Sequence, residues 1–232
     1  MEIAALIPAE GSVIDVGTDH GLLPIWLALR DERRITATDI NSAPLSRAAS
    51  AAEDAGVSHK ICFVLCDGLD ECGSSDVVII AGMGGETITG ILERAAWTRG
   101  AVLLLQPMSK TDALRTWLYE NRYHITQEVL VKDSGVIYPI MSVTGGDAPI
   151  PSRAELNLGV NVKRDGLFRE HLLEIMQKTE RKLSGLEASR KPDNLRQREE
   201  TMRLLADFRQ VLILTTDDEQ TLITDTEQEG NT

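Results

Sequence analysis

The feature that most constrains the fold is a regular alternation of short apolar runs with helical patterns between residues 12 and 124. The runs are nearly continuous Val, Ile and Leu, which is typical of strands buried on both faces of a parallel sheet. We expect strands over 12–17, 34–40, 60–66, 76–81 and 101–105, and helices over 21–31, 43–55, 86–97 and 110–122. Strands that alternate with helices at this spacing predict a doubly wound α/β fold.

The alternation stops after residue 124. Residues 124–132 and 136–144 are predicted to be two strands, and the residues DSG at 133–135 between them are a hairpin signal. A parallel sheet closed by an antiparallel terminal hairpin is the usual layout of Rossmann-like class I methyltransferases. The sequence therefore predicts an α/β domain of this kind over residues 1–146.

A second, helical domain is predicted over residues 147–214. It follows a linker, GGDAPIP at 145–151, and breaks at PDN, 192–194. The two expected apolar stripes comprise Leu167, Leu172, Ile175, Leu183 and Leu186, then Leu195, Met202, Leu205, Phe208 and Leu212. This pattern favours an antiparallel, coiled-coil-like helical hairpin. The acidic, polar residues 215–232 are expected to be disordered.

The charge is unevenly distributed along the chain. With 24 Lys and Arg against 36 Asp and Glu the net charge is −12, which taken globally argues against a nucleic-acid binder. By segment the charge is −9 over 1–150, +3 over 151–212 and −6 over 213–232. A weakly basic segment therefore lies between an acidic body and an acidic tail.

Other whole classes of protein are disfavoured by simple patterns. No apolar run reaches the roughly 18 residues of a membrane span, and the first ten residues hold no Lys or Arg, unlike a secretory signal. Cys62, Cys66 and Cys72 give no disulfide framework and lack the spacing of a metal site. We expect a cytoplasmic protein with reduced thiols, no metal and no membrane partner.

The first candidate site is DVGTDHG, residues 15–21, at the first strand-to-helix turn. Glycines such as Gly17 and Gly21 let the backbone approach a ligand, and the helix start offers free N–H groups. Asp19 stands where the dinucleotide pattern has a glycine, and its charge would repel a pyrophosphate. It suits a ligand with a positive end, such as the amino group and sulfonium of S-adenosylmethionine. The alternative is a tight turn without a ligand.

Two acidic positions follow the next two strands. Asp39, before Ile40 and 22 residues after Gly17, is placed to accept hydrogen bonds from both ribose hydroxyls. The alternative is that Asp39 caps the following helix. Asp67, in the Asp67-Gly68 pair after the third strand, is placed to face an adenine, or forms a plain turn.

The fourth strand is followed by IAGMGGE, residues 80–86. Its glycines indicate a backbone that another molecule approaches closely, at the sheet edge where α/β proteins bind substrates. We expect Ala81, Gly82 and Met83 to contact the cofactor and Gly84 to lie at the reaction site. The segment lacks the Asn/Asp-Pro-Pro-aromatic sequence of many amino-group methyltransferases, so the target atom is expected already to have a lone pair.

The remaining candidates concern the substrate. Gln106 and Pro107 end the fifth strand at the same edge, and they either line the pocket or turn the chain. Six basic residues precede or occupy the first C-terminal helix and are expected to contact phosphates, or to form a solvated helix face. They are Lys163, Arg164, Arg169, Lys178, Arg181 and Lys182.

Five motifs together resemble one family. They are DVGTDHGLLP (15–24), TDINSAPL (38–45), DGL (67–69), IAGMGG (80–85) and LQP (105–107). In this order they are similar to the bacterial tRNA (adenine-22, N1)-methyltransferase family, the TrmK type, over residues 3–212. The chain departs from the family by a late start and by Met108, where Asn is frequent.

The resemblance implies S-adenosyl-L-methionine as cofactor, tRNA as partner and direct methyl transfer to N1 of adenine. The N1 lone pair needs no deprotonation, and a carboxylate would stabilise the cationic product ring. Asp19, beside His20, is expected either to do this or to hold the methionine amino group. A monomer is favoured. The open alternatives are methyl transfer to a small molecule or protein, and an inactive adenosylmethionine-binding adaptor.

Overall fold

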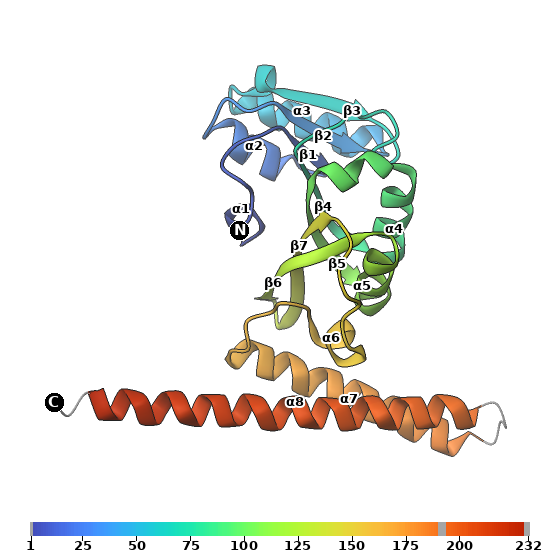
Figure 1. Ribbon diagram of the computed structural model, residues 1–232. Coiled ribbons are helices and arrows are strands. Elements are labelled where there is room, and N and C mark those ends of the chain that lie inside the picture. The colour runs from blue at the N-terminus through green and yellow to red at the C-terminus, as the bar shows by residue number, and fades with distance from the viewer. Residues whose placement is uncertain (1, 190–193, 230–232) are drawn as a thin grey trace. The chain divides into compact units, whose positions relative to one another are not determined.

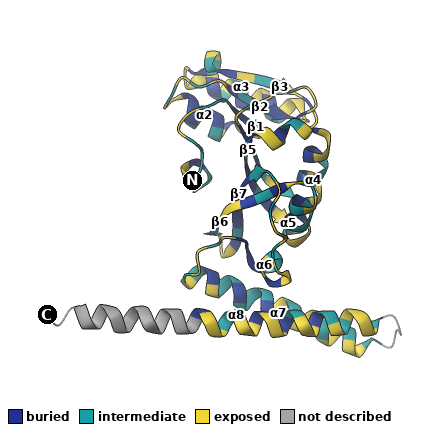
Figure 2. Cartoon of the chain, in the orientation of Figure 1, coloured by how far each residue is buried: buried dark blue, intermediate teal, exposed yellow. Residues whose placement is uncertain are grey.

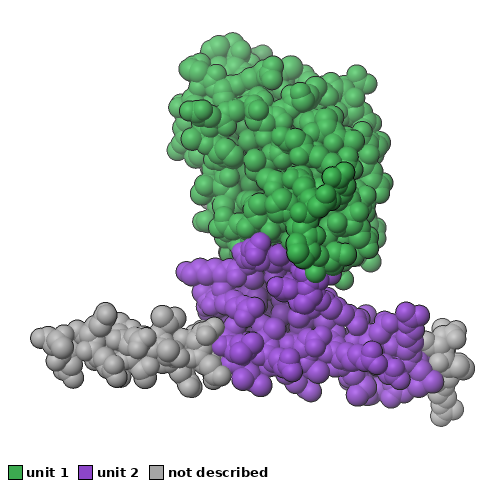
Figure 3. All heavy atoms as spheres, viewed as in Figure 1, with its two compact units in different colours: residues 1–150 green, residues 151–232 purple. Residues whose placement is uncertain are grey.

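The computed structural model describes residues 2–189 and 194–229, with side chains up to Thr215. The chain divides into two compact units, residues 1–150 and 151–232 (Figure 3).

The first unit contains one seven-stranded sheet (Figure 1). Its strands are β1 (Val13–Val16), β2 (Ile35–Asp39), β3 (Ile61–Leu65), β4 (Val77–Gly84), β5 (Val102–Ser109), β6 (Tyr123–Asp133) and β7 (Val136–Gly145). The strand order is β3-β2-β1-β4-β5-β7-β6, and β7 runs antiparallel to both β5 and β6. The other pairs are parallel. The predicted Rossmann-like methyltransferase sheet with a terminal antiparallel hairpin is therefore confirmed.

Helices cover both faces of the sheet. They are α1 (Glu2–Ala5), α2 (Leu22–Ala28), α3 (Ser42–Asp54), α4 (Gly85–Arg94) and α5 (Thr111–Glu120), with 3-10 turns at Ser58–Lys60 and Ala96–Gly100. The chain runs from β3 to β4 without an intervening helix. Helices α2 and α3 pack on β2 and β3, and α4 packs on β4 and β5.

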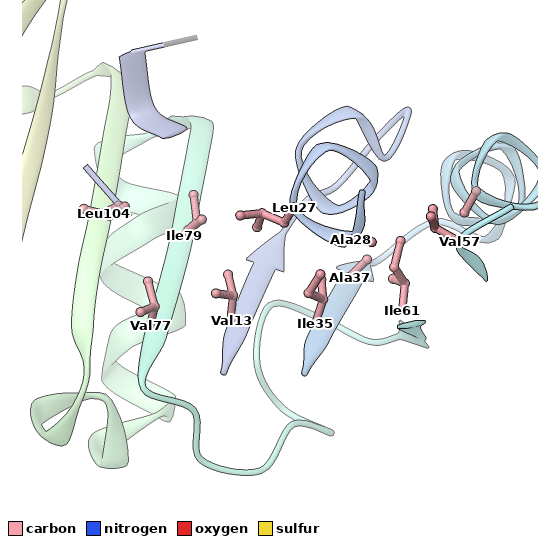
Figure 4. Packing of buried hydrophobic residues seen from close by; sticks show 11 residues of the cluster. Val13, Leu27, Ala28, Ile35, Ala37, Val57, Ile61, Val77, Ile79 and Leu104 are labelled. Atoms are coloured by element: carbon pink, nitrogen blue, oxygen red, sulfur yellow. The ribbon is translucent and has the colours of Figure 1, made fainter. Parts of the chain in front are cut away.

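The core follows from the alternation of side chains along buried strands. One face of the sheet contributes Val13, Ile35 and Val77, which pack with Leu27 of α2 (Figure 4). The next residue along β1, Ile14, points to the opposite face and is only 3% exposed. Figure 2 shows buried residues along the strands of the sheet. Burial on both faces explains why these strands have no polar alternation in the sequence.

The terminal hairpin turns through two residues with left-handed backbone. Ser134 has φ 50° and Gly135 has φ 82°. Two positive φ values in a two-residue loop are the requirement of a type I′ turn, whose twist matches that of the flanking strands. The predicted hairpin at 133–135 is therefore confirmed.

The glycine-rich segment after the predicted fourth strand is still part of that strand. Strand β4 continues to Gly84 and β5 to Ser109, with register shifts on either side of Met83. Glycine usually ends strands, so the pattern predicted that β4 would stop at Ala81. Bulges accommodate the extra residue, and pairing with β5 keeps the segment in the sheet.

The second unit consists of α6 (Arg153–Leu158), α7 (Gly166–Ala188) and α8 (Asn194–Glu229). Helix α7 packs along α8. The buried apolar residues of this unit include Phe168, Leu172 and Met176 on α7 and Leu205 and Phe208 on α8. The expected division of the C-terminal part into a helical domain and a tail stays a prediction. The side chains of residues 216–232 lie outside the described part of the chain.

Candidate cofactor and substrate site

A cavity of about 340 Å³ opens at the carboxyl ends of the parallel strands. It is lined by Val16, Gly17, Thr38, Asp39, Ile40, Asn41, Asp67, Gly68, Ala81, Gly82, Met83, Thr87 and Ile91. Strand β1 lies between β2 and β4, and the chain winds outward in both directions from it. This is the topological switch point at which open α/β sheets bind ligands.

The cavity gathers residues from all four N-terminal motifs. Of the predicted cofactor contacts, Gly17, Asp39, Ile40, Asp67, Gly68, Ala81, Gly82 and Met83 line it, whereas Asp15, Asp19 and Gly21 do not. The predicted reaction-site residues His20 and Gly84 are also outside its lining. Sequence reasoning missed Val16, Thr38, Asn41, Thr87 and Ile91. The first three directly adjoin predicted residues, and the last two are a turn apart on α4, a spacing that could have identified them.

Gly17 forms the floor of the cavity where β1 ends. Its φ is +73°, and its N–H donates to the carbonyl of Thr38 at 2.8 Å. A Cβ on Gly17 would collide with the terminal methyl of Met83. The Gly17 backbone and the Met83 thioether thus approach each other at the switch point. A side chain at position 17 would occupy the space that Met83 now fills between β1 and β4.

Asp39 ends β2 and is buried, with 9% of its surface exposed. Its Oδ1 accepts a hydrogen bond from the Asn41 N–H at 2.8 Å. Helix α3 begins at Ser42, so this bond organises the turn into the helix. Within the described part of the chain Oδ2 accepts no hydrogen bond, so it remains as an acceptor beside the cavity. The helix-entry role and the ligand role are therefore compatible in one carboxylate.

The turn after β3 is held from two sides. The Gly68 carbonyl accepts from the Thr38 hydroxyl at 3.0 Å, and the Asp67 carboxylate pairs with Arg94 at 3.1 Å. Gly68 has φ +62°, and a Cβ there would lie 2.7 Å from Ile91. A residue with a side chain would be both strained and overpacked at this position, so the turn is specific for glycine.

Asp19 and His20 lie outside the cavity on the exposed β1–α2 turn. Asp19 has φ 48°, a left-handed conformation that is unusual for a residue with a side chain. Its carboxylate is 3.4 Å from His20 Nε2 and 3.4 Å from Arg47 Nη2. The side chains are more than half exposed, so these pairs contribute little to stability. They bring a carboxylate, an imidazole and a guanidinium together.

Asp15 and Gly21, the two remaining candidate residues of the DVGTDHG motif outside the cavity, are buried. Asp15 lies within β1, where burial raises the pKa of its carboxyl to about 6 and the neighbouring Thr18 hydroxyl opposes the rise. A Cβ on Gly21 would lie 2.9 Å from the Ala48 side chain, so Gly21 permits α2 and α3 to pack closely. The structure thus gives both residues positions within the core.

The glycines of the IAGMGGE segment differ from one another. Gly82 has φ +74° and open space where a Cβ would point. Gly84 has φ −66°, with the Ser109 hydroxyl 3.3 Å from a built Cβ. At Gly85 a Cβ would lie 2.6 Å from the Lys110 carbonyl oxygen, at the start of α4. The first glycine is required by conformation and the third by packing.

Gln106 lies on β5 directly beside this segment. Its Oε1 accepts a hydrogen bond from the Gly82 N–H at 2.9 Å. Its Nε2 is 3.4 Å from the Pro107 carbonyl and 3.3 Å from the Met108 sulfur. Pro107 is buried in β5. Gln106 therefore binds Gly82, which lines the cavity, but does not itself line it.

The six basic residues predicted to meet tRNA are exposed in the second unit. Lys163 and Lys178 have acidic neighbours, Asp165 at 3.8 Å and Glu174 at 3.9 Å. Arg164 lines a separate hollow of about 350 Å³ in the helical unit. Helical spacing puts Lys178, Arg181 and Lys182 on one side of α7 and Arg169 on another. The structure does not gather the six into one patch.

The cavity suits a nucleoside with a positively charged extension. Asp39 offers an acceptor oxygen, Gly17 and Gly68 line the cavity without side chains, and Ile40 supplies an apolar contact. Of the side chains that line it, none is cationic and two are carboxylates. Such a donor and acceptor set fits a ribose and a cation better than a phosphate.

This fold and site define a Rossmann-like methyltransferase. The methyltransferase domain family matches residues 1–141, more than half of the chain, and the chain belongs to that family. The resemblance to the TrmK-type tRNA (adenine-22, N1)-methyltransferases is also confirmed, by the relatives that follow.

One relative is the tRNA (adenine(22)-N(1))-methyltransferase of Bacillus subtilis (strain 168), with 33% identity over 150 residues. The match spans 62% of this chain and 63% of that protein, less than two thirds of its length. The crystal structure of the B. subtilis m1A22 tRNA methyltransferase TrmK superposes with a TM-score of 0.81 at 26% identity, covering 91% of this chain and 96% of that one.

A second similar structure is that of Streptococcus pneumoniae Sp1610, a putative tRNA (m1A22) methyltransferase, in complex with S-adenosyl-L-methionine. Its TM-score is 0.72 at 27% identity, with 91% of this chain and 96% of that chain covered. Within the described residues of the present protein, no helix is long and apolar enough to cross a membrane. The same residues contain no cluster of three or more His, Cys, Asp or Glu suited to a metal ion.

Proposed function

We propose that the protein transfers a methyl group from S-adenosyl-L-methionine to N1 of an adenine in tRNA, adenine 22. The observation that carries the proposal is the cavity at the β1–β4 switch point, where Gly17, Asp39 and the Gly82 segment meet. The 33% identical B. subtilis relative, named for this reaction, supports the choice of substrate.

Different residues of the cavity contact different parts of the cofactor. Asp39 accepts hydrogen bonds from the ribose through Oδ2, since Oδ1 is occupied by Asn41. Asp67 and Gly68 contact the adenine end, and Ile40 packs on it. Gly17 and Met83 enclose the methionine end at the switch point. When bound, the cofactor supplies an electrophilic methyl group.

Positioning and charge supply the catalysis. Adenine N1 carries its own lone pair, so no residue has to remove a proton before attack. Methylation makes the ring cationic, and the Asp19 carboxylate beside His20 stabilises that charge or holds the methionine amino group. The edge formed by Gly82 and Gly84 receives the base, which must be unpaired or flipped out of the tRNA to reach it.

The tRNA is held by its phosphates and shape rather than by base sequence. The exposed cations Arg164, Arg169, Arg181 and Lys182, together with the ion-paired Lys163 and Lys178, contact the backbone from the helical unit. The protein acts in the cytoplasm, where tRNA is modified, and as a monomer.

Labelled methyl transfer tests the proposal. The full chain is incubated with methyl-labelled S-adenosyl-L-methionine and unmodified tRNA, and the digested nucleosides are separated. We expect label in 1-methyladenosine, and none when adenine 22 of the transcript is replaced by another base. Label on a metabolite or protein instead, or cofactor binding without any transfer, would overturn the proposal.

A further inference from the structure

We propose that Gln106 is a positioning residue that holds the Gly82 bulge, and with it the substrate side of the cavity, in a conformation ready for methyl transfer. The inference rests on the proposed function and concerns how its site is organised. It gives Gln106 a role other than the two that the sequence left open, which were to line the substrate pocket or to turn the chain.

The bulge itself creates the need for such a residue. Ala81 pairs with Gln106 and Met83 pairs with Pro107, so two adjacent β5 positions face three β4 positions and Gly82 is the extra residue. The extra residue of a bulge is left outside the regular ladder. Its N–H therefore needs an acceptor from elsewhere, and the Gln106 side chain supplies it at 2.9 Å.

The geometry fixes the orientation of the Gln106 amide. Oε1 must face the Gly82 N–H because only the oxygen accepts, and Nε2 then faces the Pro107 carbonyl and the Met108 sulfur. With both ends of the amide engaged by β4 and β5, the side chain lies across the strand pair. It is half-buried and is not among the residues that line the cavity.

The neighbours of Gly82 connect this bond to the reaction site. Ala81 and Met83 both line the cavity, and the Met83 methyl lies over Gly17. Gly82 has a left-handed φ of +74°, and no atom lies within 4 Å of the point where a Cβ would be, so no side-chain packing holds it on that side. Loss of the Gln106 bond would therefore free the bulge, and small displacements of a reacting pair cost rate steeply.

Two substitutions separate hydrogen bonding from volume. Gln106→Met keeps the length of the side chain and removes the acceptor, whereas Gln106→Glu keeps an acceptor for the Gly82 N–H. We expect Gln106→Met to lower kcat about tenfold, the effect of losing one well-placed hydrogen bond, with Kd for S-adenosyl-L-methionine changed less than about threefold. Gln106→Glu should retain more of kcat than Gln106→Met.

Amide hydrogen exchange gives a readout that does not depend on turnover. In Gln106→Met the Gly82 amide should exchange about tenfold faster than in the native protein, because its hydrogen bond is lost. Gln127→Met, an exposed Gln on β6 outside the cavity, is the matched control and should change neither exchange nor kcat.

The outcomes distinguish the two proposals. If the native protein does not methylate tRNA but Gly82 exchange rises in Gln106→Met, the proposed function fails and the positioning role stands. The positioning role is overturned if Gly82 exchange is unchanged in Gln106→Met, or if its kcat equals that of the native chain. A rise in KM for tRNA at constant kcat also overturns it, in favour of a direct tRNA contact.

Discussion

Asp39 shows how one side chain can serve both the fold and the site. The sequence offered a helix cap or a ribose contact as alternatives, and the structure uses one carboxylate oxygen to organise the turn into α3. The other oxygen remains beside the cavity. The spacing of the motifs predicts an acid at the end of the second strand. Which carboxylate oxygen binds the Asn41 N–H, and which stays beside the cavity, depends on the three-dimensional position of that N–H.

The helix-entry bond of Asp39 and its proposed contact with the ribose are separable by substitution. Asp39→Asn keeps an oxygen for the Asn41 N–H but replaces the second acceptor by a donor, and Asp39→Ala removes both. We expect either change to weaken S-adenosyl-L-methionine binding by about 1 to 3 kcal/mol, while only Asp39→Ala also lowers the melting temperature. Calorimetry and thermal unfolding measure the two effects, and unchanged affinity in both variants would remove Asp39 from the ribose.

The buried carboxyl of Asp15 makes the folding stability of the protein depend on pH. Its pKa is about 6 in the folded protein, against 3.8 for the ordinary carboxyl, because burial disfavours the charged form. Between these values the unfolded chain loses the proton first, so the contribution of Asp15 to folding stability falls as the pH rises from about 4 to about 6 and then levels off.

Replacing Asp15 by Asn removes this titration. The free energy of unfolding of Asp15→Asn relative to the native chain should therefore rise by up to about 3 kcal/mol between pH 4 and pH 7. Urea unfolding of both proteins over this range measures the difference, in which the other titrating groups cancel. A difference that is constant with pH would mean that Asp15 is not a desolvated carboxylate.

At the scale of elements, the sequence predicted the sheet well and the ends of β4 and β5 poorly. Strand and helix alternation depends on local periodicity, which a single sequence contains. The continuation of β4 through Gly82 depends on pairing with β5 and on a side-chain bond from Gln106, which are contacts between residues distant in sequence. A prediction from local propensity alone therefore ends β4 at Ala81, whereas the strand continues to Gly84.

The short helix α6 was missed although its signal is local. Ser152 and Glu155 form a reciprocal capping box, a pattern that can be recognised from spacing alone. The helical hairpin was expected, but its apolar stripes were only partly right. Leu195 and Met202 were expected to be buried and are 64% and 54% exposed, whereas Phe168 and Met176 are buried. Which side of each helix is covered depends on how the helices pack.

Gly84 and Gly85, at the junction of β4 and α4, differ in how closely they are packed. A Cβ at Gly85 would overlap backbone atoms of Lys110 and Ser109, which cannot rotate away. We expect Gly85→Ala to destabilise the fold by about 1 to 3 kcal/mol through overpacking. At Gly84 the nearest atom is a hydroxyl that can rotate, so Gly84→Ala should change stability by less than about 0.5 kcal/mol. Denaturant unfolding compares the pair, and equal losses would contradict this packing argument.

At the scale of the whole molecule, charge is divided between the two units. Residues 1–150 carry −9 and residues 151–212 carry +3, so phosphate attraction is expected from the helical unit. Acids interleave with the cations there, and several cations already have an acidic neighbour, such as Arg209 with Glu180 at 3.7 Å. The net charge of −12 therefore does not decide against a nucleic-acid substrate, because its distribution matters more than its sum.

Removing the helical unit should separate cofactor binding from tRNA binding. A chain ending at Ile150 keeps the seven-stranded sheet and every cavity residue, so it should bind S-adenosyl-L-methionine with nearly native affinity. It loses the net basic segment, and phosphate neutralisation supplies most non-specific affinity for nucleic acids. We expect tRNA binding by the shortened chain to fall at least about tenfold, measured by gel shift at fixed salt.

The full-length chain supplies the matched test of this electrostatic argument. Arg181 and Lys182 are exposed on one side of α7, whereas Lys178 beside them has Glu174 at 3.9 Å. If phosphate contacts account for the loss in the shortened chain, Arg181→Gln with Lys182→Gln should weaken tRNA binding and flatten its dependence on log salt by about one unit for each lost contact. Lys178→Gln should have a smaller effect, since its charge is already partly neutralised. A shortened chain that binds and methylates tRNA as well as the full chain at the same salt would instead require a local basic patch on the acidic unit.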